Sequence, residues 1–263
     1  MVIDFHVHAF EDRGSVEDFI DTMDQNGVDI SVLMPVVPRW KGGGTTSTEY
    51  VCDLVQSYPE RFVAFATVIP FEDDAPDKLE RYVREYGCRG LKLHPPIQNF
   101  LPSDPRTFPV IWKAVELDIP VLYHTGAIFL PTARLRLSDP VEVDDLAIAI
   151  PAAKIVLAHG DPLGSHPVVA GKHANVWMDL SITFPRLAKI LPGLGANLLE
   201  YMSVFTPHAA DKLLFGSDAS PGKPALQKDA LEAVQAIDTD DVTKAKILGG
   251  NAARLLKLPL RTD

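Results

Sequence analysis

A chain of 263 residues is long enough for one large α/β domain or two small ones, and its formal net charge is −10. No cluster of Lys and Arg could follow a phosphate backbone, so nucleic acid is excluded as an expected partner and a small-molecule substrate is favoured. No apolar run approaches the roughly 20 residues that cross a bilayer, and the start lacks the basic segment of a signal peptide. Two cysteines, Cys52 and Cys88, are too few for a disulfide framework. Together these features predict a cytoplasmic protein with no membrane partner.

Short apolar runs rich in Val, Ile, Leu and Phe alternate with longer amphipathic stretches, a pattern typical of βα units around a parallel sheet. Eight strands are predicted, at residues 2–8, 30–37, 62–70, 90–94, 120–125, 154–159, 175–181 and 213–218. Eight parallel strands close a barrel, so we predict an α/β fold, a (β/α)8 TIM-type barrel, with residues 1–263 as a single domain.

Helices are predicted between the strands. Residues 15–23 begin with Ser15 as N-cap, place Phe19, Ile20 and Met23 on one face, and end before Gly27. Residues 77–86 and 109–117 follow the same logic.

Three connections that follow strands are long and rich in turn-forming residues, at 38–47, 95–109 and 126–141. Loops after the strands build the active face of such a barrel, so these are candidate lids and specificity loops, with plain surface decoration as the alternative. Arg134 and Arg136 in the last loop could bind a substrate carboxylate, although loop arginines are more often solvated.

His6 and His8 stand one residue apart in the first predicted strand, which places both imidazoles on one face together with Asp4. A His-x-His pair alone is a weak signal. His124 and His159 strengthen it, because each ends an apolar strand and is followed, directly or after one residue, by a glycine that lets the chain turn.

Asp218 ends the last predicted strand. A carboxylate after so apolar a run is costly unless it is paired or binds a cation, and no basic residue is near it in the sequence. An Asp that caps the following helix is the alternative, but that explains Asp218 alone and leaves the histidines unexplained.

Several segments that span nearly the whole chain are similar to those of one known family. They are Asp4-Phe5-His6-Val7-His8, Gly90-Leu91-Lys92-Leu93-His94-Pro95, Tyr123-His124-Thr125-Gly126, Leu157-Ala158-His159-Gly160, Phe215-Gly216-Ser217-Asp218 and Gly250-Asn251-Ala252-Ala253-Arg254-Leu255-Leu256. The chain resembles the amidohydrolase superfamily, specifically the amidohydrolase-2 group that includes aminocarboxymuconate-semialdehyde decarboxylase-like proteins.

The resemblance implies a divalent metal, zinc in preference, with His6, His8, His124 and Asp218 as its ligands and His159 as a base or a further ligand. Lys92 is the ambiguous position, because members with two metals carry a carboxylated lysine on the fourth strand. Lys92 is then carboxylated, binds a substrate carboxylate, or pairs with Asp4 or another acid. We favour one metal ion, with two as the alternative.

The remaining histidines divide by context. His94 shares the face of Lys92, and either polarises a substrate carbonyl or is a structural histidine under the Pro95-Pro96 turn. His166, His173 and His208 stand in polar settings away from the strand ends, which predicts surface positions.

The predicted function is metal-dependent hydrolysis of a small, carboxylate-bearing molecule. A metal lowers the pKa of bound water toward about 7, Asp218 moves the proton, and His159 assists. Nonoxidative decarboxylation of an aromatic or enoic acid at the same site is the first alternative, and the compact chain favours the hydrolase. An inactive metal-binding barrel is the second alternative. Substrate identity and oligomeric state are left open, a homo-oligomer included.

Overall fold

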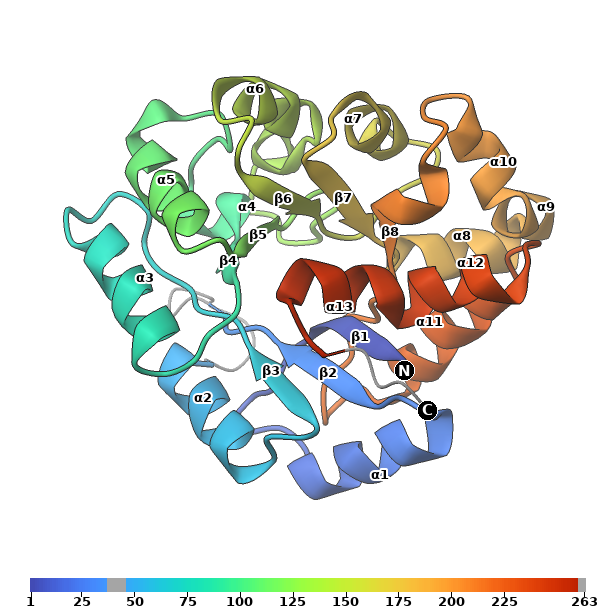
Figure 1. The fold of residues 1–263 in the computed structure, drawn as a ribbon, viewed down its shortest axis with the longest axis horizontal. Helices are drawn as coiled ribbons and strands as arrows, with labels where there is room; N and C mark the ends of the chain where they lie inside the picture. Colours follow the sequence, from blue (N-terminus) through green and yellow to red (C-terminus); the bar gives the residue numbers. More distant parts are fainter. Residues whose placement is uncertain (37–45, 260–263) are drawn as a thin grey trace.

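The computed structural model describes residues 1–36 and 46–259. Eight parallel strands are arranged around a central axis with helices outside them (Figure 1). The strands are β1 (Ile3–Val7), β2 (Ile30–Leu33), β3 (Phe62–Ala64), β4 (Leu91–Leu93), β5 (Pro120–Tyr123), β6 (Lys154–Leu157), β7 (Val176–Asp179) and β8 (Leu213–Leu214). Each lies inside one predicted run, so the predicted (β/α)8 barrel is confirmed, with strands shorter than expected.

The strands form two hydrogen-bonded sheets, β1-β2-β3 and β4-β5-β6-β7-β8, and two seams join them. At one seam Ala66 forms an isolated parallel bridge with Leu91. At the other, Val7 forms a parallel bridge with Ala219, and the Phe5 N–H donates to the Phe215 carbonyl at 2.9 Å. The first seam connects β3 to β4, and the second connects β8 to β1.

Helices and 3-10 turns follow the strands and cover the outside of the barrel. They are α1 (Val16–Asn26), α2 (Thr48–Ser57), α3 (Ala75–Arg84), α4 (Pro95–Gln98), η1 (Pro105–Thr107), α5 (Phe108–Glu116), η2 (Leu135–Ser138), α6 (Val141–Ala149), α7 (His166–Lys172), α8 (Thr183–Ile190), α9 (Pro192–Ala196), α10 (Leu198–Ser203), η3 (Ala209–Lys212), α11 (Ala225–Gln235), α12 (Asp241–Ala245), the π-helical η4 (Lys246–Gly250) and α13 (Asn251–Leu256). None of the described helices is long and apolar enough to cross a membrane.

Helix α1 shows how local sequence sets these elements. The Ser15 hydroxyl accepts a hydrogen bond from the Asp18 N–H, and Gly27 ends the helix in the left-handed conformation at φ 68°. Phe19 and Met23 are buried on the inner face. The predicted cap, inner face and stop are confirmed.

Two layers of apolar side chains hold the barrel together. The larger core lies between the strands and the helices and includes Phe19, Leu79 and Phe215, while a smaller cluster around Phe5 and Phe65 packs next to α13. Both faces of β1 are buried, as expected for a strand inside a parallel barrel. Buried polar side chains at the strand ends are therefore exceptions that need an explanation.

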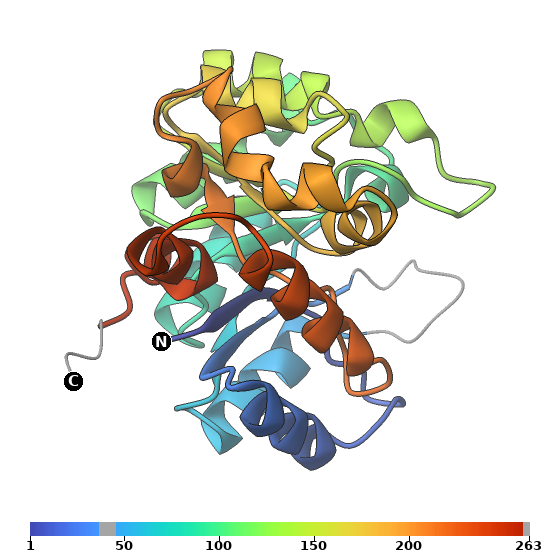
Figure 2. The same ribbon diagram turned by 90° about the vertical axis from the view of Figure 1, so that its right-hand side faces the viewer.

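The connection at 126–141 extends from the side opposite the two termini (Figure 2). The connection 95–109 contains α4 and η1, and 126–141 contains η2. Most of the predicted lid at 38–47 lies outside the described residues.

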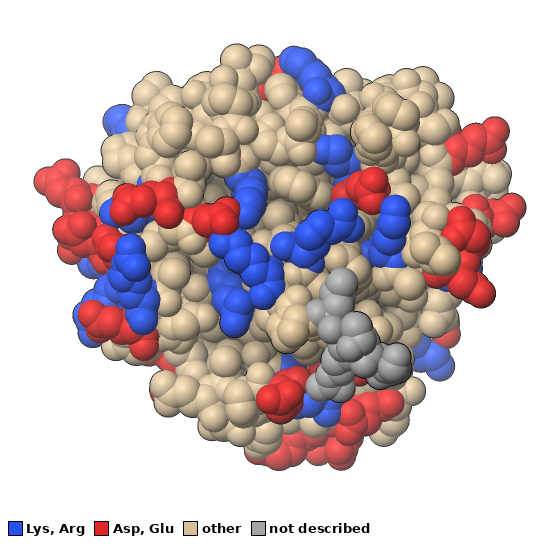
Figure 3. All heavy atoms as spheres, viewed as in Figure 1, with Lys and Arg blue, Asp and Glu red and all other residues tan. Residues whose placement is uncertain are grey.

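The face that carries the termini has Lys and Arg side chains across its middle and acidic side chains around its rim (Figure 3). Several lysine side chains of the protein form ion pairs or hydrogen bonds within it. Lys154 and Lys257 both pair with Asp118, and the Lys212 ammonium donates to the carbonyls of His173, Ala174 and Val176 at 2.7, 2.9 and 3.1 Å. These interactions give the three lysines a structural role in the folded protein.

Candidate metal centre

The strand ends bring most of the predicted site residues to one cavity of about 360 Å³. His6 lies in β1 and is fully buried. The site residues that line the cavity itself are His8, Lys92, His94, His124, His159 and Asp218. Sequence reasoning therefore predicted which polar residues converge.

Three ligand atoms form a tight triangle at this cavity. His6 Nε2 lies 3.3 Å from His8 Nε2, and Asp218 Oδ1 lies 3.5 Å from the first nitrogen and 3.2 Å from the second. Metal bonds of about 2.0–2.2 Å in a tetrahedral arrangement separate neighbouring ligand atoms by about 3.3–3.6 Å. The spacing of His6, His8 and Asp218 thus fits a divalent metal ion.

The tautomers of His6 and His8 support the same conclusion. His6 Nδ1 lies 2.9 Å from Asp179 Oδ2, and His8 Nδ1 lies 2.8 Å from the Met34 carbonyl oxygen. Both partners can only accept, so each Nδ1 carries the hydrogen, and a neutral imidazole then presents a lone pair at Nε2. Two lone pairs and a carboxylate oxygen face one another, an arrangement that a cation stabilises.

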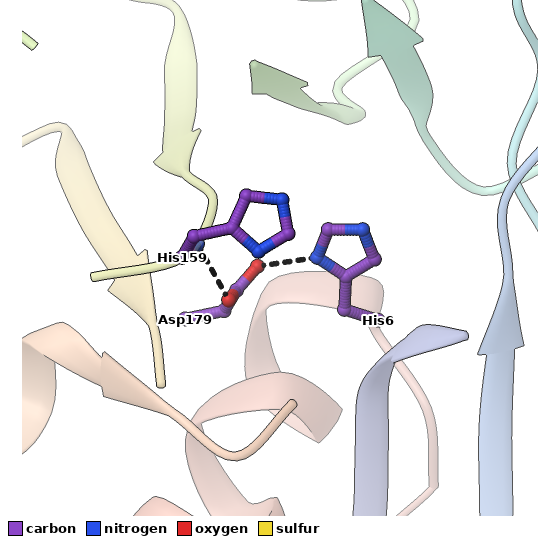
Figure 4. Close-up of side chains that lie close together, drawn as sticks. All are labelled: His6, His159 and Asp179. Atoms are coloured by element: carbon purple, nitrogen blue, oxygen red, sulfur yellow. Dashed lines mark hydrogen bonds and ion pairs between the residues drawn. The ribbon is translucent and has the colours of Figure 1, made fainter. Parts of the chain in front are cut away.

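Asp179 is the residue of the candidate site that sequence reasoning missed. It ends β7, is fully buried, and lies between His6 and His159 (Figure 4). Its Oδ1 accepts from the His159 N–H at 3.0 Å while its Oδ2 accepts from the His6 ring. Burial raises its pKa, but the attraction and hydrogen bond of His6 outweigh burial and hold that pKa well below its usual range. Asp179 therefore fixes the orientation of a candidate ligand as a carboxylate partner does.

A hydrogen-bond relay from Asp179 orients His124. The Ser181 hydroxyl donates to Asp179 Oδ1 at 2.5 Å, so its oxygen accepts from His159 Nδ1–H at 2.8 Å. His159 Nε2 then accepts from His124 Nδ1–H at 3.1 Å. Burial lowers the pKa of His159 to about 3 and that of His124 well below its usual range, so both rings are neutral near pH 7.

The end of this relay is the Nε2 lone pair of His124. That atom is buried and makes no hydrogen bond with the residues that the structure describes. The structure does not place His124 in the triangle of His6, His8 and Asp218. Its unpaired nitrogen nevertheless has the chemistry of a further metal ligand, as a buried acceptor without a donor is costly.

Lys92 is buried beside the triangle. Its Nζ lies 3.3 Å from His6 Nε2, and burial lowers its pKa to about 8. The alternative pairing of Lys92 with Asp4 is not formed. The Asp4 carboxylate instead accepts from the Ser217 N–H and hydroxyl at 2.9 and 2.6 Å and from Gln227 Nε2 at 3.1 Å.

His94 lines the cavity and stacks on His124, with ring centroids 3.9 Å apart and an interplanar angle of 11°. Its backbone N–H donates to Gln98 Oε1 at 2.7 Å, which fixes the start of α4. Burial, followed by the positive charge of Lys92, lowers the pKa of His94 well below its usual range. His94 thus borders the cavity as a neutral ring.

The backbone at two of these positions adopts a sparsely populated conformation. His159 and Asp218 both have φ 59°, in the left-handed region that non-glycine residues rarely occupy. The His159 N–H donates to Asp179 Oδ1, and the Asp218 N–H donates to the His6 carbonyl at 2.7 Å. Such backbone conformations are concentrated at functional sites, where surrounding contacts hold them.

We expect Asp4→Ala to lower the free energy of unfolding by roughly 2–4 kcal/mol, because it leaves buried donors of Ser217 and Gln227 unsatisfied. Chemical denaturation measures the change. Asp21→Ala on the exposed side of α1 is the matched control and should change stability by less than about 0.5 kcal/mol. Equal effects of the two substitutions would contradict the conclusion that Asp4 stabilises the fold by accepting these buried hydrogen bonds.

The prediction that His166 lies on the surface is wrong. His166 is 2 % exposed, because α7 turns it inward against the loop after β5. Its Nε2 lies 3.1 Å from the Thr125 hydroxyl, which itself donates to the Ala158 carbonyl at 2.6 Å. His173 is also partly buried, 2.5 Å from Asp144, whereas His208 is exposed as predicted.

Burial lowers the pKa of His166 from 6.5 to about 4. The unfolded chain therefore takes up a proton before the folded one, and stability falls as pH drops from 6.5 toward 4. We expect the difference in unfolding free energy between wild type and His166→Gln to shrink by about 2 kcal/mol between about pH 7.5 and about pH 5. His208→Gln is the control, and a constant His166 difference would refute the assignment.

The comparisons with known proteins show the family of the chain. A family model described as amidohydrolase matches residues 3–258. The chain belongs to the amidohydrolase family. The predicted resemblance to the amidohydrolase superfamily is confirmed, so the chain belongs to a superfamily of enzymes. No match to a curated protein was found.

Solved structures share the fold of this amidohydrolase at low sequence identity. An uncharacterized TIM-barrel protein from Bordetella bronchiseptica is 21% identical with a TM-score of 0.77, over 98% of both chains. The 5-carboxyvanillate decarboxylase LigW from Sphingomonas paucimobilis is 15% identical with a TM-score of 0.72, over 98% of this chain and 99% of its own. A dihydroxybenzoic acid decarboxylase from Polaromonas sp. JS666, with bound manganese and 2-nitroresorcinol, is 17% identical with a TM-score of 0.74, over 98% of this chain and 97% of its own.

Proposed function

We propose that this amidohydrolase catalyses the metal-dependent, nonoxidative decarboxylation of a small organic acid. The observation that carries the proposal is the position of Lys92, whose Nζ lies 3.3 Å from the same His6 nitrogen that faces His8 and Asp218. A lysine cation next to a metal site suits a substrate whose carboxylate is bound at the reacting end.

The residues that would hold the metal are His6, His8 and Asp218, with His124 as the further ligand that the sequence predicted. The bound ion supplies Lewis-acid stabilisation of negative charge on substrate oxygens. A nitrogen-rich ligand set suits zinc, while the Polaromonas structure has manganese bound. We therefore propose one divalent ion and leave zinc as a prediction for metal analysis.

The remaining steps belong to side chains of this chain. Lys92 would pair with the substrate carboxylate, and loss of carbon dioxide leaves the bonding electron pair on carbon. Asp218 would deliver a solvent-derived proton to that carbon. Burial raises the pKa of Asp218, but His8 and the other nearby histidines lower it well below its usual range, so the residue is a carboxylate at neutral pH and would hold the proton only during its transfer from solvent.

His159 and His94 have supporting roles in this proposal. Both nitrogens of His159 are engaged, with Ser181 and with His124, so we propose that it positions His124 and assists the reaction through it. His94 borders the cavity and would contact the substrate through its ring.

Hydrolysis at the same site is the rival that the sequence favoured because the chain is compact. The Sphingomonas and Polaromonas decarboxylases match this chain over 98% of its length, with TM-scores of 0.72 and 0.74. Both of these neighbours are named for decarboxylation, which supports the reaction that the sequence analysis gave as its first alternative.

The two reactions are separated by their products. Metal-loaded protein is incubated with 2,6-dihydroxybenzoate and 5-carboxyvanillate, and carbon dioxide and the decarboxylated phenol are quantified. In parallel, esters, lactones and amides of similar size are assayed for hydrolysis. We expect carbon dioxide release that His8→Ala abolishes. Hydrolysis of a member of the second panel, without carbon dioxide from either acid, would overturn the proposal.

Lys92→Ala tests the cation separately. We expect unchanged metal content, near one ion per chain, and binding of benzoate weakened by about tenfold, since a charge-assisted pair contributes about 1.5 kcal/mol or more. Elemental analysis and calorimetry measure the two quantities. Loss of metal together with Lys92 would instead indicate a carboxylated lysine that bridges two ions.

A further inference from the structure

The candidate site has an excess of positive charge in a protein whose net charge is −10. Three cationic side chains, Arg13, Lys92 and Lys223, line the cavity. Among the described residues that line it, Asp218 is the only carboxylate, and it belongs to the proposed metal ligands. The cavity therefore attracts anions with more than one charge.

Arg13 and Lys223 are delivered by the same two strands that deliver metal ligands. Arg13 follows His8 by five positions, and Lys223 follows Asp218 by five positions. Both lie beyond the strand ends, so they stand farther out than Lys92, which is within β4. The arrangement gives one cation at the floor of the cavity and two at its rim.

Contacts between the two loops hold the rim cations on the same side. Gly14 has φ +75°, and a Cβ there would lie 2.5 Å from the Pro221 carbonyl carbon. A Cβ at Gly222 would lie 3.4 Å from Arg13 Cβ. The loops are therefore packed backbone against backbone, and only glycine fits at position 14.

The rim cations are weakly neutralised. The Arg13 guanidinium lies over the Phe10 ring at 5.2 Å, and that ring lies 6.1 Å from the ring of His8. Its acidic contact is Asp12, at 3.8 Å and 65% exposed, a geometry that contributes little. Lys223 forms no ion pair with any residue in the described part of the chain. By contrast, Arg134 and Arg136, the loop arginines considered from the sequence, are exposed and do not line the cavity.

We propose that Arg13 and Lys223 form a rim site for a second carboxylate, so that the substrate is a small dicarboxylate. One carboxylate would react beside Lys92, and the other would be held at the rim and stay on the product. This inference rests on the proposed function for the reacting carboxylate. Arginine suits the retained group because its guanidinium binds a carboxylate through two parallel hydrogen bonds.

The test measures binding, without turnover. Isothermal titration of metal-loaded protein compares isophthalate, which has two carboxylates, with benzoate, which has one. We expect isophthalate to bind about tenfold more tightly, and Arg13→Gln or Lys223→Gln to remove most of that advantage while benzoate binding changes less than about twofold. Arg136→Gln is the matched control and should change neither ligand.

Several outcomes overturn the rim site. They are equal affinity of the wild type for both ligands, no binding of isophthalate, and equal loss of both ligands in the rim variants. Metal content is measured for each variant and should stay at the wild-type value. Failure of the proposed reaction would appear separately, as absence of carbon dioxide release in a protein that still distinguishes the two ligands.

Discussion

His8→Ala is expected to remove the bound metal ion while the barrel stays folded. The variant removes one corner of the triangle whose edges are 3.2–3.5 Å, and the remaining ligands bind a metal ion less tightly than the full set. Activity should fall to background. Elemental analysis after dialysis measures occupancy, and circular dichroism checks the fold.

His8 is the better position for this experiment than His6. The His8 side chain is 15% exposed, and its other nitrogen donates to the Met34 carbonyl. Removal of His6 would also leave the buried Asp179 carboxylate without its ring partner. His208→Ala, an exposed histidine, is the matched control. Full metal occupancy in the His8 variant would contradict the assigned ligand set.

Asp218→Asn is expected to reduce turnover by roughly 10² to 10⁴-fold, because an amide cannot move the proton that the reaction requires. Asparagine is a suitable replacement, since it tolerates the left-handed backbone found at Asp218, where φ is 59°. The loss of activity should therefore greatly exceed any loss of stability.

The Asn variant must be assayed at measured metal occupancy, because an amide oxygen is also a weaker ligand than a carboxylate. Rates are compared per bound ion, and thermal denaturation of the same samples measures stability. Near wild-type turnover per bound ion would show that Asp218 is not the proton carrier.

The sequence predicted the barrel and which polar side chains lie together at one end of it, because both depend on local patterns. Buried parallel strands give short apolar runs, and polar side chains at their ends, such as His8, His124 and Asp218, break those runs visibly. One fold then brings all strand ends of one polarity together. The convergence of these strand-end residues could therefore be predicted without knowledge of any distance between them.

The partners of these residues could not be predicted, because they are set by packing between distant segments. His6 and Asp179 are 173 residues apart in the sequence. A usable signal was present at Asp179, a carboxylate at the end of an apolar strand like Asp218. His166 stands in a polar stretch, and only the docking of α7 shows that it is buried. The proximity of Arg13 to Lys223 likewise depends on contact between two loops.

The most direct test of the metal centre is anomalous X-ray diffraction from crystals of the protein as purified, recorded at the absorption edge of the metal found by elemental analysis. A single peak within bonding distance of His6 Nε2, His8 Nε2 and Asp218 Oδ1, next to an unmodified Lys92, is the predicted result. No peak at these atoms, or two peaks bridged by a carboxylated Lys92, would contradict it.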